Sequence, residues 1–180
     1  MKIALLGAPH TGKTRLVQEL VSALQSRGHT ARVLSPSESG LPNCDFVIAD
    51  TTALLAAVYP DMDPQNDALK RSAIAEQEKF DLTLLTGLDL SSATTARQRQ
   101  VDARLREVLQ AHDLRYSVVY GAGDQRCANA LAVVDQWTSP GSNHFSVQHP
   151  GWQWVCDKCS DAQCEHQLFT SLLGSAPPKA

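Results

Sequence analysis

One short segment near the start of the chain constrains its fold more than any other feature. The segment reads GAPHTGKT and matches the pattern G-x-x-x-x-G-K-[ST] without a mismatch. Its glycines let the backbone turn sharply, so that successive N–H groups can point at phosphate oxygens. An apolar stretch, Lys2–Leu6, precedes it and a helical pattern follows, which is the context that the motif requires. The pattern predicts a phosphate-binding loop made of Gly7, Ala8, Pro9, His10, Thr11, Gly12, Lys13 and Thr14.

The last two residues of this loop have separate chemical roles. We expect Lys13 to reach the β- and γ-phosphates of a nucleotide as a point charge, and the Thr14 hydroxyl to ligate Mg²⁺. The helix that follows adds the positive end of its dipole. The sequence has no guanine signature of the NKxD type, so ATP is favoured over GTP.

Apolar runs alternate with helical patterns along the chain, which predicts an α/β fold. We expect strands at Lys2–Leu6, Ala31–Leu34, Asp45–Ala49, Leu82–Thr86 and Tyr116–Tyr120. We expect helices at Thr14–Arg27, Thr51–Tyr59, Asp67–Lys79, Ala96–His112 and Gln125–Trp137. With a phosphate-binding loop after the first strand, the order predicts a P-loop NTPase fold: a parallel five-stranded sheet flanked by helices.

Asp50 is the best-placed acidic residue for catalysis. It follows the apolar run FVIA, and ligands of open parallel sheets bind outside the carboxyl ends of the strands. Its carboxylate could hold the Mg²⁺ shell, as a Walker-B aspartate does, or accept a proton from a substrate hydroxyl. The structural alternative is that Asp50 is the N-cap of the helix expected from Thr51.

Several arginines follow the fourth expected strand, where phosphoryl-transfer enzymes often carry a lid. They are Arg97, Arg99, Arg104 and Arg106. A guanidinium can stabilise charge on a transferred phosphoryl group. The alternative is a solvated helix face on which Asp102 and Arg106 form an i,i+4 pair. Arg126 follows the fifth strand, near the expected place of a nucleotide base.

The chain changes character after the fifth helix, where histidines and cysteines gather. We expect a nucleotide-binding domain at 1–138, a Cys/His-rich extension at 139–174 and a disordered tail at 175–180. The extension carries the spacing C-x₂-C-x₄-C-x-H at Cys156, Cys159, Cys164 and His166.

Three thiolates and one imidazole complete a tetrahedral shell for Zn²⁺, and a closed shell is structural rather than catalytic. In regular helix Cys164 and His166 would point apart, so His149 or His144 is the alternative fourth ligand. The other interpretation is that the thiols are unligated or form a redox-active pair. The lone Cys44 and Cys127 are interpreted as core residues.

Composition limits the classes of partner. The 180 residues are 43% hydrophobic and carry a net charge of −3, which argues against a nucleic-acid binder held mainly by phosphate neutralisation. No apolar run has the length of a membrane span, and the N-terminal stretch reads as a strand rather than a signal peptide. We therefore expect a cytoplasmic protein with no membrane or nucleic-acid partner.

Four segments in this order and spacing resemble the NadR-like P-loop kinases and ATPases, of which the nicotinamide riboside kinase domain is the best-known member. They are GAPHTGKT, CDFVIADTTALLAAVY, FDLTLLTGLDL and YSVVYGAGDQR. The resemblance implies a kinase-like fold, Mg-ATP on Gly7–Thr14, an acceptor near Asp50, and a role for Arg126 in the nucleotide-side loop. The riboside kinases carry an aromatic-Asp-Gly-Arg lid segment after a Pro-Trp pair, which TGLDLSSATTARQRQ lacks, so another acceptor is expected.

Two functions follow from these patterns. The first is an ATPase or small-molecule kinase that moves the γ-phosphoryl group of ATP to an unidentified acceptor, for which a nucleoside-like molecule is one candidate. The second is a nucleotide-switched module whose zinc segment engages a partner protein.

Overall fold

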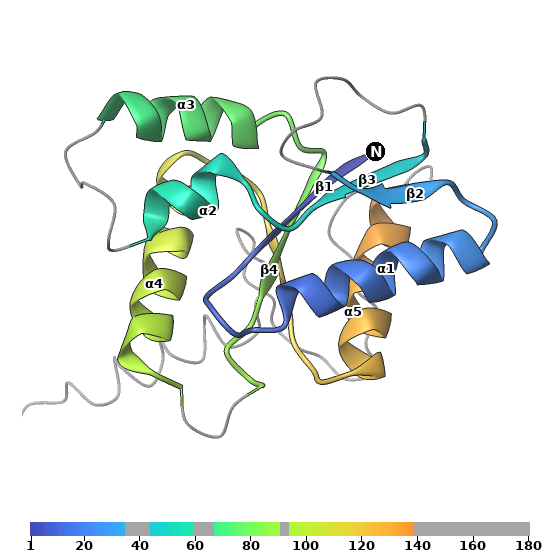
Figure 1. Cartoon of the computed structure of the whole chain (residues 1–180). Coiled ribbons are helices and arrows are strands. Elements are labelled where there is room, and N and C mark those ends of the chain that lie inside the picture. Colours follow the sequence, from blue (N-terminus) through green and yellow to red (C-terminus); the bar gives the residue numbers. More distant parts are fainter. Residues whose placement is uncertain (35–43, 60–66, 91–93, 139–180) are drawn as a thin grey trace, which may run out of the picture.

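The computed structural model describes residues 1–34, 44–59, 67–90 and 94–138 (Figure 1). Strands and helices alternate along this part of the chain. In order they are β1 (Lys2–Leu6), α1 (Lys13–Ser26), β2 (Ala31–Val33), β3 (Phe46–Ala49), α2 (Ala53–Val58), α3 (Asp67–Gln77), β4 (Leu82–Thr86), α4 (Ala96–Ala111), β5 (Ser117–Val119) and α5 (Asp124–Thr138). The expected extension and tail, 139–174 and 175–180, lie outside the described residues.

The strands form one five-stranded sheet in the order β2-β3-β1-β4-β5, and all four neighbouring pairs are parallel. Every residue of β3 and β4 is buried, as expected for parallel strands that are covered on both faces. The predicted α/β fold with a parallel five-stranded sheet is therefore confirmed.

Helices cover both faces of the sheet and enclose two apolar layers. Helices α1 and α5 lie on one face, where their apolar residues pack against side chains such as Ile3 and Leu84. Helices α2, α3 and α4 lie on the other face, where they pack against side chains such as Leu6 and Leu85 (Figure 1). None of the described helices combines the length and apolarity needed to cross a bilayer.

Capping residues set where two of the helices begin. Helix α2 starts at Ala53 because Thr52 is its N-cap, whose hydroxyl accepts a hydrogen bond from Leu55 N at 3.2 Å. The sequence-based alternative that Asp50 caps this helix is therefore wrong. Helix α4 begins with a capping box, in which Thr95 and Gln98 satisfy each other's backbone N–H groups.

The strand order fixes the edge at which a ligand would bind. The chain leaves β1 toward β2 on one side and leaves β3 toward β4 on the other, so the connections diverge between the adjacent strands β1 and β3. In open α/β sheets the crevice outside the strand ends at such a switch point is the usual ligand site. The loop after β1 and Asp50 after β3 both lie at this point.

Candidate nucleotide-binding site

The loop between β1 and α1 has the backbone conformation that its glycines allow. Gly7 has a φ of 149°, and a Cβ atom there would lie 1.9 Å from Oγ1 of Thr86. Only glycine therefore lets the loop pass this closely over the end of β4. Gly12, with a φ of 74°, takes the left-handed conformation just before α1.

Two buried threonines hold the loop against the sheet. The Thr11 hydroxyl donates to Ala8 O at 2.7 Å, and the Thr86 hydroxyl donates to Leu6 O at 3.2 Å. The two hydroxyl oxygens lie 2.7 Å apart. Thr86 was not among the residues predicted from the sequence, although its place as the last residue of β4, beside β1, could have indicated it.

Lys13 lies at the start of α1 with its ammonium inside the loop. Its Nζ donates to Ala8 O at 2.8 Å. Burial lowers the pKa of this ammonium, and the nearby Asp50 carboxylate partly opposes that effect. A partly desolvated cation that lies within a glycine-rich loop at the start of a helix is suited to bind a phosphate group.

Thr14 and Asp50, which were predicted as a magnesium pair, come together although they lie on different elements. The Thr14 hydroxyl donates to Asp50 Oδ2 at 3.3 Å, and Thr51 donates to the other carboxylate oxygen at 3.2 Å. A hydroxyl and a carboxylate are the hard oxygen donors that Mg²⁺ takes from proteins, together with water and phosphate oxygens. The residues present therefore fit this ion.

Arg126 is buried behind the loop, and its guanidinium is held by protein groups. The side chain is 3% exposed, with Nη1 donating to Thr11 O and Nε to Gly121 O, each at 2.7 Å. Its Nη2 forms an ion pair with Asp89 and donates to Gly87 O at 3.5 Å. Burial lowers the pKa of this guanidinium, and the Asp89 carboxylate counteracts that effect.

Through these contacts Arg126 connects three loops, which follow strands β1, β4 and β5. Asp89 adds to this network of hydrogen bonds, because its carboxylate also accepts one from the Gly121 amide. The sequence predicted that Arg126 would contact a nucleotide, whereas its guanidinium N–H groups donate to protein oxygens. Its contribution to nucleotide binding would then act through the position of the loop.

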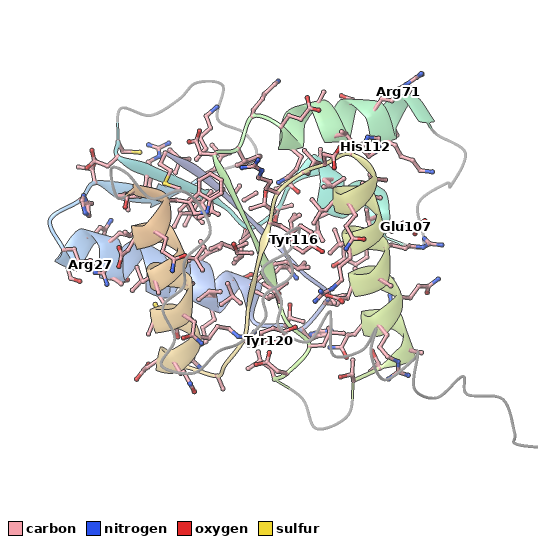
Figure 2. All side chains as sticks on the ribbon, turned by 180° about the vertical axis from the view of Figure 1, so that it is seen from behind. Arg27, Arg71, Glu107, His112, Tyr116 and Tyr120 are labelled. Atoms are coloured by element: carbon pink, nitrogen blue, oxygen red, sulfur yellow. The ribbon has the colours of Figure 1, made fainter. Side chains whose placement is uncertain are left out.

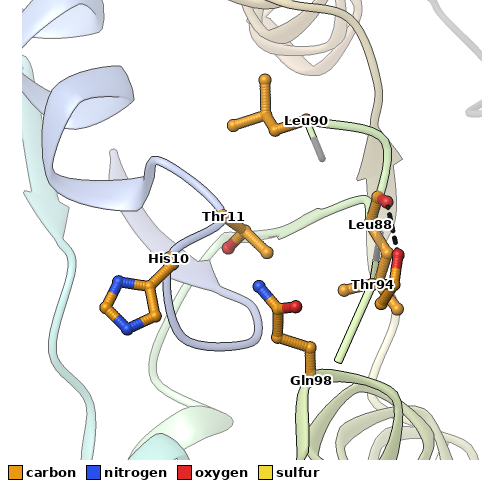
Figure 3. Close-up of a pocket in the computed structure, with 6 residues that line it drawn as sticks. All are labelled: His10, Thr11, Leu88, Leu90, Thr94 and Gln98. Carbon is orange, nitrogen blue, oxygen red and sulfur yellow. Dashed lines mark hydrogen bonds between the residues drawn. The ribbon is translucent and has the colours of Figure 1, made fainter. Parts of the chain in front are cut away.

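A small pocket beside the loop is lined by the side chains that Figure 3 shows. They are His10, Thr11, Leu88, Leu90, Thr94 and Gln98. Gln98 joins α4 to the loop, because its Nε2 donates to Pro9 O at 2.9 Å. The sequence analysis did not single out Gln98, although the spacing Thr95-x-x-Gln98 is a capping-box signal.

Two of the other candidate arginines, Arg99 and Arg106, have local partners in the structure. Arg99 donates to Thr94 O at 2.6 Å, and Arg106 forms the predicted i,i+4 pair with Asp102 at 2.8 Å. Cys127 is half-buried and packs against the core, and the half-buried Cys44 donates to Phe46 O.

The predicted zinc ligands Cys156, Cys159, Cys164 and His166, and the alternatives His149 and His144, lie outside the described residues. Within residues 1–34, 44–59, 67–90 and 94–138, no three His, Cys, Asp or Glu side chains are grouped as a metal site would require. The zinc site thus stays a prediction from the sequence.

One known structure supports the architecture. The crystal structure of NadR protein in complex with NR matches 81% of this chain with a TM-score of 0.53 and 19% sequence identity. The chain has a P-loop kinase-like fold. It covers 52% of that NadR chain, about half its length, and at this identity the likeness shows the fold alone.

Sequence comparison adds one further similarity. The tRNA nuclease CdiA of Yersinia mollaretii is 28% identical over 133 residues, which are 74% of this chain and 4% of CdiA. The chain thus spans a very small part of that protein. No protein-family model matches the sequence.

We expect Arg126→Met to lower both stability and nucleotide affinity. Methionine keeps much of the side-chain volume but leaves Asp89 and Thr11 O without their donor. Asp89 is partly exposed, so the loss of this pair together with the buried hydrogen bond to Thr11 O should cost about 1–3 kcal/mol. Chemical denaturation would measure the first effect and calorimetric titration with Mg-ATP the second.

The conservative variant Arg126→Lys keeps the charge but not the fork of donors. It should recover part of the stability and little of the nucleotide affinity. Arg99→Met, at an exposed position of α4, is the matched control and should change neither. If Arg126→Met lost stability but bound Mg-ATP like the parent, the contacts of Arg126 would have no part in shaping the loop.

Proposed function

We propose that this chain binds Mg-ATP and transfers its γ-phosphoryl group to a small-molecule hydroxyl or to water. The proposal rests on one observation: Lys13, Thr14 and Asp50 lie together at the switch point of the sheet. The likeness to the fold of NadR supports the same class of chemistry. Since that protein was crystallised with NR, nucleosides are the first acceptors to test.

Each part of the site has a task in such a reaction. The amides of Gly7–Thr14 would hold phosphate oxygens, and the Lys13 ammonium would balance the charge on the β- and γ-phosphates. Thr14 and Asp50 would hold Mg²⁺, which neutralises phosphate charge when it is bound with the nucleotide. If Asp50 instead faces the acceptor, its carboxylate would take the proton of the attacking hydroxyl.

The test is a coupled assay of ADP release by the full chain. Mg-ATP is supplied alone and then with each member of a panel of nucleosides and sugars at equal concentration. Release that one acceptor stimulates identifies a kinase, and release without any acceptor identifies an ATPase. No release together with no heat of Mg-ATP binding would overturn the proposal.

A second candidate is a nucleotide-switched module whose cysteine-rich segment engages a partner protein. The similarity to part of CdiA, which is described as a tRNA nuclease, adds tRNA as a target to test, against the expectation from the net charge of −3. The chain is incubated with tRNA in the presence and absence of Mg-ATP, and the tRNA is examined on a denaturing gel. Nucleotide-dependent cleavage or binding would favour this candidate over the kinase.

We also propose that residues 139–174 hold one structural zinc ion. The purified protein should then contain about one zinc per chain by elemental analysis, since the sequence offers soft sulfur donors and imidazole. Cys159→Ser should lose the metal, whereas the control Cys44→Ser should keep it. Nucleotide binding should survive metal removal, because the P-loop lies in the separate α/β unit.

Protein that is prepared without chelator and contains no zinc would contradict the metal assignment. The cysteines would then be unligated thiols or a redox pair of Cys156 and Cys159. Titration of free thiols before and after a reducing agent would separate these two cases.

A further inference from the structure

A second cavity lies away from the P-loop, on the face of the sheet that α2, α3 and α4 cover. Its volume is about 520 Å³, within the range of small-molecule sites in proteins. Side chains of all three helices line it. The apolar part of the lining is Leu54, Ala57, Val58, Tyr59, Ile74, Val108 and Ala111.

Charged side chains at the rim of this cavity are mostly cationic. Arg71 of α3 and Arg104 of α4 line it together with Lys70, against the single carboxylate of Glu107. Figure 2 shows Arg71, Glu107 and His112 at the same corner of the molecule. Within the part of the chain that the structure describes, neither Arg71 nor Arg104 has an ion-pair partner. A cationic rim is notable in a chain whose net charge is −3.

The cavity is separate from the candidate nucleotide site. Gln98, in the first turn of α4, contacts the P-loop, whereas the cavity residues of this helix run from Arg104 to His112. At 1.5 Å per residue these positions lie about 9 to 21 Å farther along the helix. The two groups of residues therefore do not share a ligand of ordinary size.

We propose that this cavity binds a small organic anion that has an apolar body. The apolar lining would bury the body of such a ligand, and the guanidinium groups of Arg71 and Arg104 would pair with its carboxylate, sulfonate or phosphate. A metal cation does not fit, because the rim is cationic and offers one carboxylate. A neutral apolar molecule would offer no anionic group to the guanidinium groups of Arg71 and Arg104.

The probe for this site is 8-anilinonaphthalene-1-sulfonate, an aromatic anion whose fluorescence rises in apolar surroundings. Its uncharged counterpart, N-phenyl-1-naphthylamine, has the same aromatic body without the sulfonate. We expect the sulfonate to bind the folded full-length chain at least about tenfold more tightly than the neutral compound. Amide shifts in ¹H–¹⁵N spectra should change in α2, α3 and α4 and not in the loop Gly7–Thr14.

Arg71→Glu and Arg104→Glu should each weaken binding of the sulfonate by about tenfold or more. The matched control is Arg99→Glu, which makes the same charge change on α4 outside the cavity and should leave binding unchanged. Denaturant unfolding with a midpoint close to that of the parent reports that both cavity variants are folded. The milder Arg71→Ala and Arg104→Ala replace any charge-reversal variant that does not fold.

Three results would overturn the proposal. The neutral compound could bind as tightly as the sulfonate, which would make the cavity a plain apolar surface. The amide shifts could fall on the P-loop, or Mg-ATP could displace the probe, which would place the probe in the nucleotide site. Binding that both arginine variants leave unchanged would show that the anion lies elsewhere.

Discussion

Replacing Lys13 by alanine is expected to weaken Mg-ATP binding by at least about 100-fold. Such a loss corresponds to roughly 3 kcal/mol, the contribution of a charge-assisted contact to phosphate in a partly buried site. Lys13 Nζ is the cation that the structure places inside the loop, 2.8 Å from Ala8 O. Isothermal titration calorimetry measures the effect directly.

The fold should survive this substitution. Burial lowers the pKa of Lys13, which means that the folded protein disfavours the charged form of this side chain. Removing the ammonium relieves that penalty, which offsets the loss of its hydrogen bond to Ala8 O, and alanine is a good helix former at the first position of α1. Denaturant unfolding should show an unchanged midpoint.

Arg15→Ala is the matched control for Lys13→Ala. It removes a cation two residues along the same helix, where the side chain is 73% exposed and pairs only locally with Glu19. Its nucleotide affinity should stay within about twofold of the parent, since a surface ion pair contributes little. Equal affinities of the parent and the Lys13→Ala protein would mean that GAPHTGKT is not a phosphate-binding loop.

The sequence predicted the fold well because its signals are local. Buried parallel strands read as apolar runs such as Leu82–Thr86, whose predicted bounds match β4. The P-loop was likewise predictable, since its motif is continuous and has one mechanical purpose. The predicted and observed helix bounds differ by up to two residues. At α2 the difference arises because Thr52, which the pattern predicts inside the helix, is its N-cap.

The support of the loop could not be predicted because it depends on contacts between distant residues. Arg126 meets Thr11 across 115 positions and Asp89 across 37. Both contacts need the strand order that places β4 between β1 and β5. The sequence indicated Arg126 as a residue after the fifth strand, but not that it pairs with Asp89.

Asp50→Asn is expected to lower turnover by on the order of 10²-fold while Mg-ATP affinity changes far less. Asparagine keeps the shape of the side chain and one oxygen, but it carries no charge to hold Mg²⁺ and takes up no proton from a hydroxyl. The 3.3 Å contact with Thr14 places this carboxylate where either task would be performed. Steady-state kinetics, which separates kcat from KM, is the measurement.

The control for this last prediction is Thr52→Ala, two residues away. Thr52 is the actual N-cap of α2, so its loss should cost about 1 kcal/mol of stability and leave turnover unchanged. Asp50→Asn should do the reverse, with an intact unfolding midpoint and a low kcat. An Asp50→Asn protein with parental turnover and lowered stability would reduce this residue to a structural role. Because Thr52 is the cap, a role of the Asp50 carboxylate toward magnesium or the acceptor stays the prediction that this pair of variants tests.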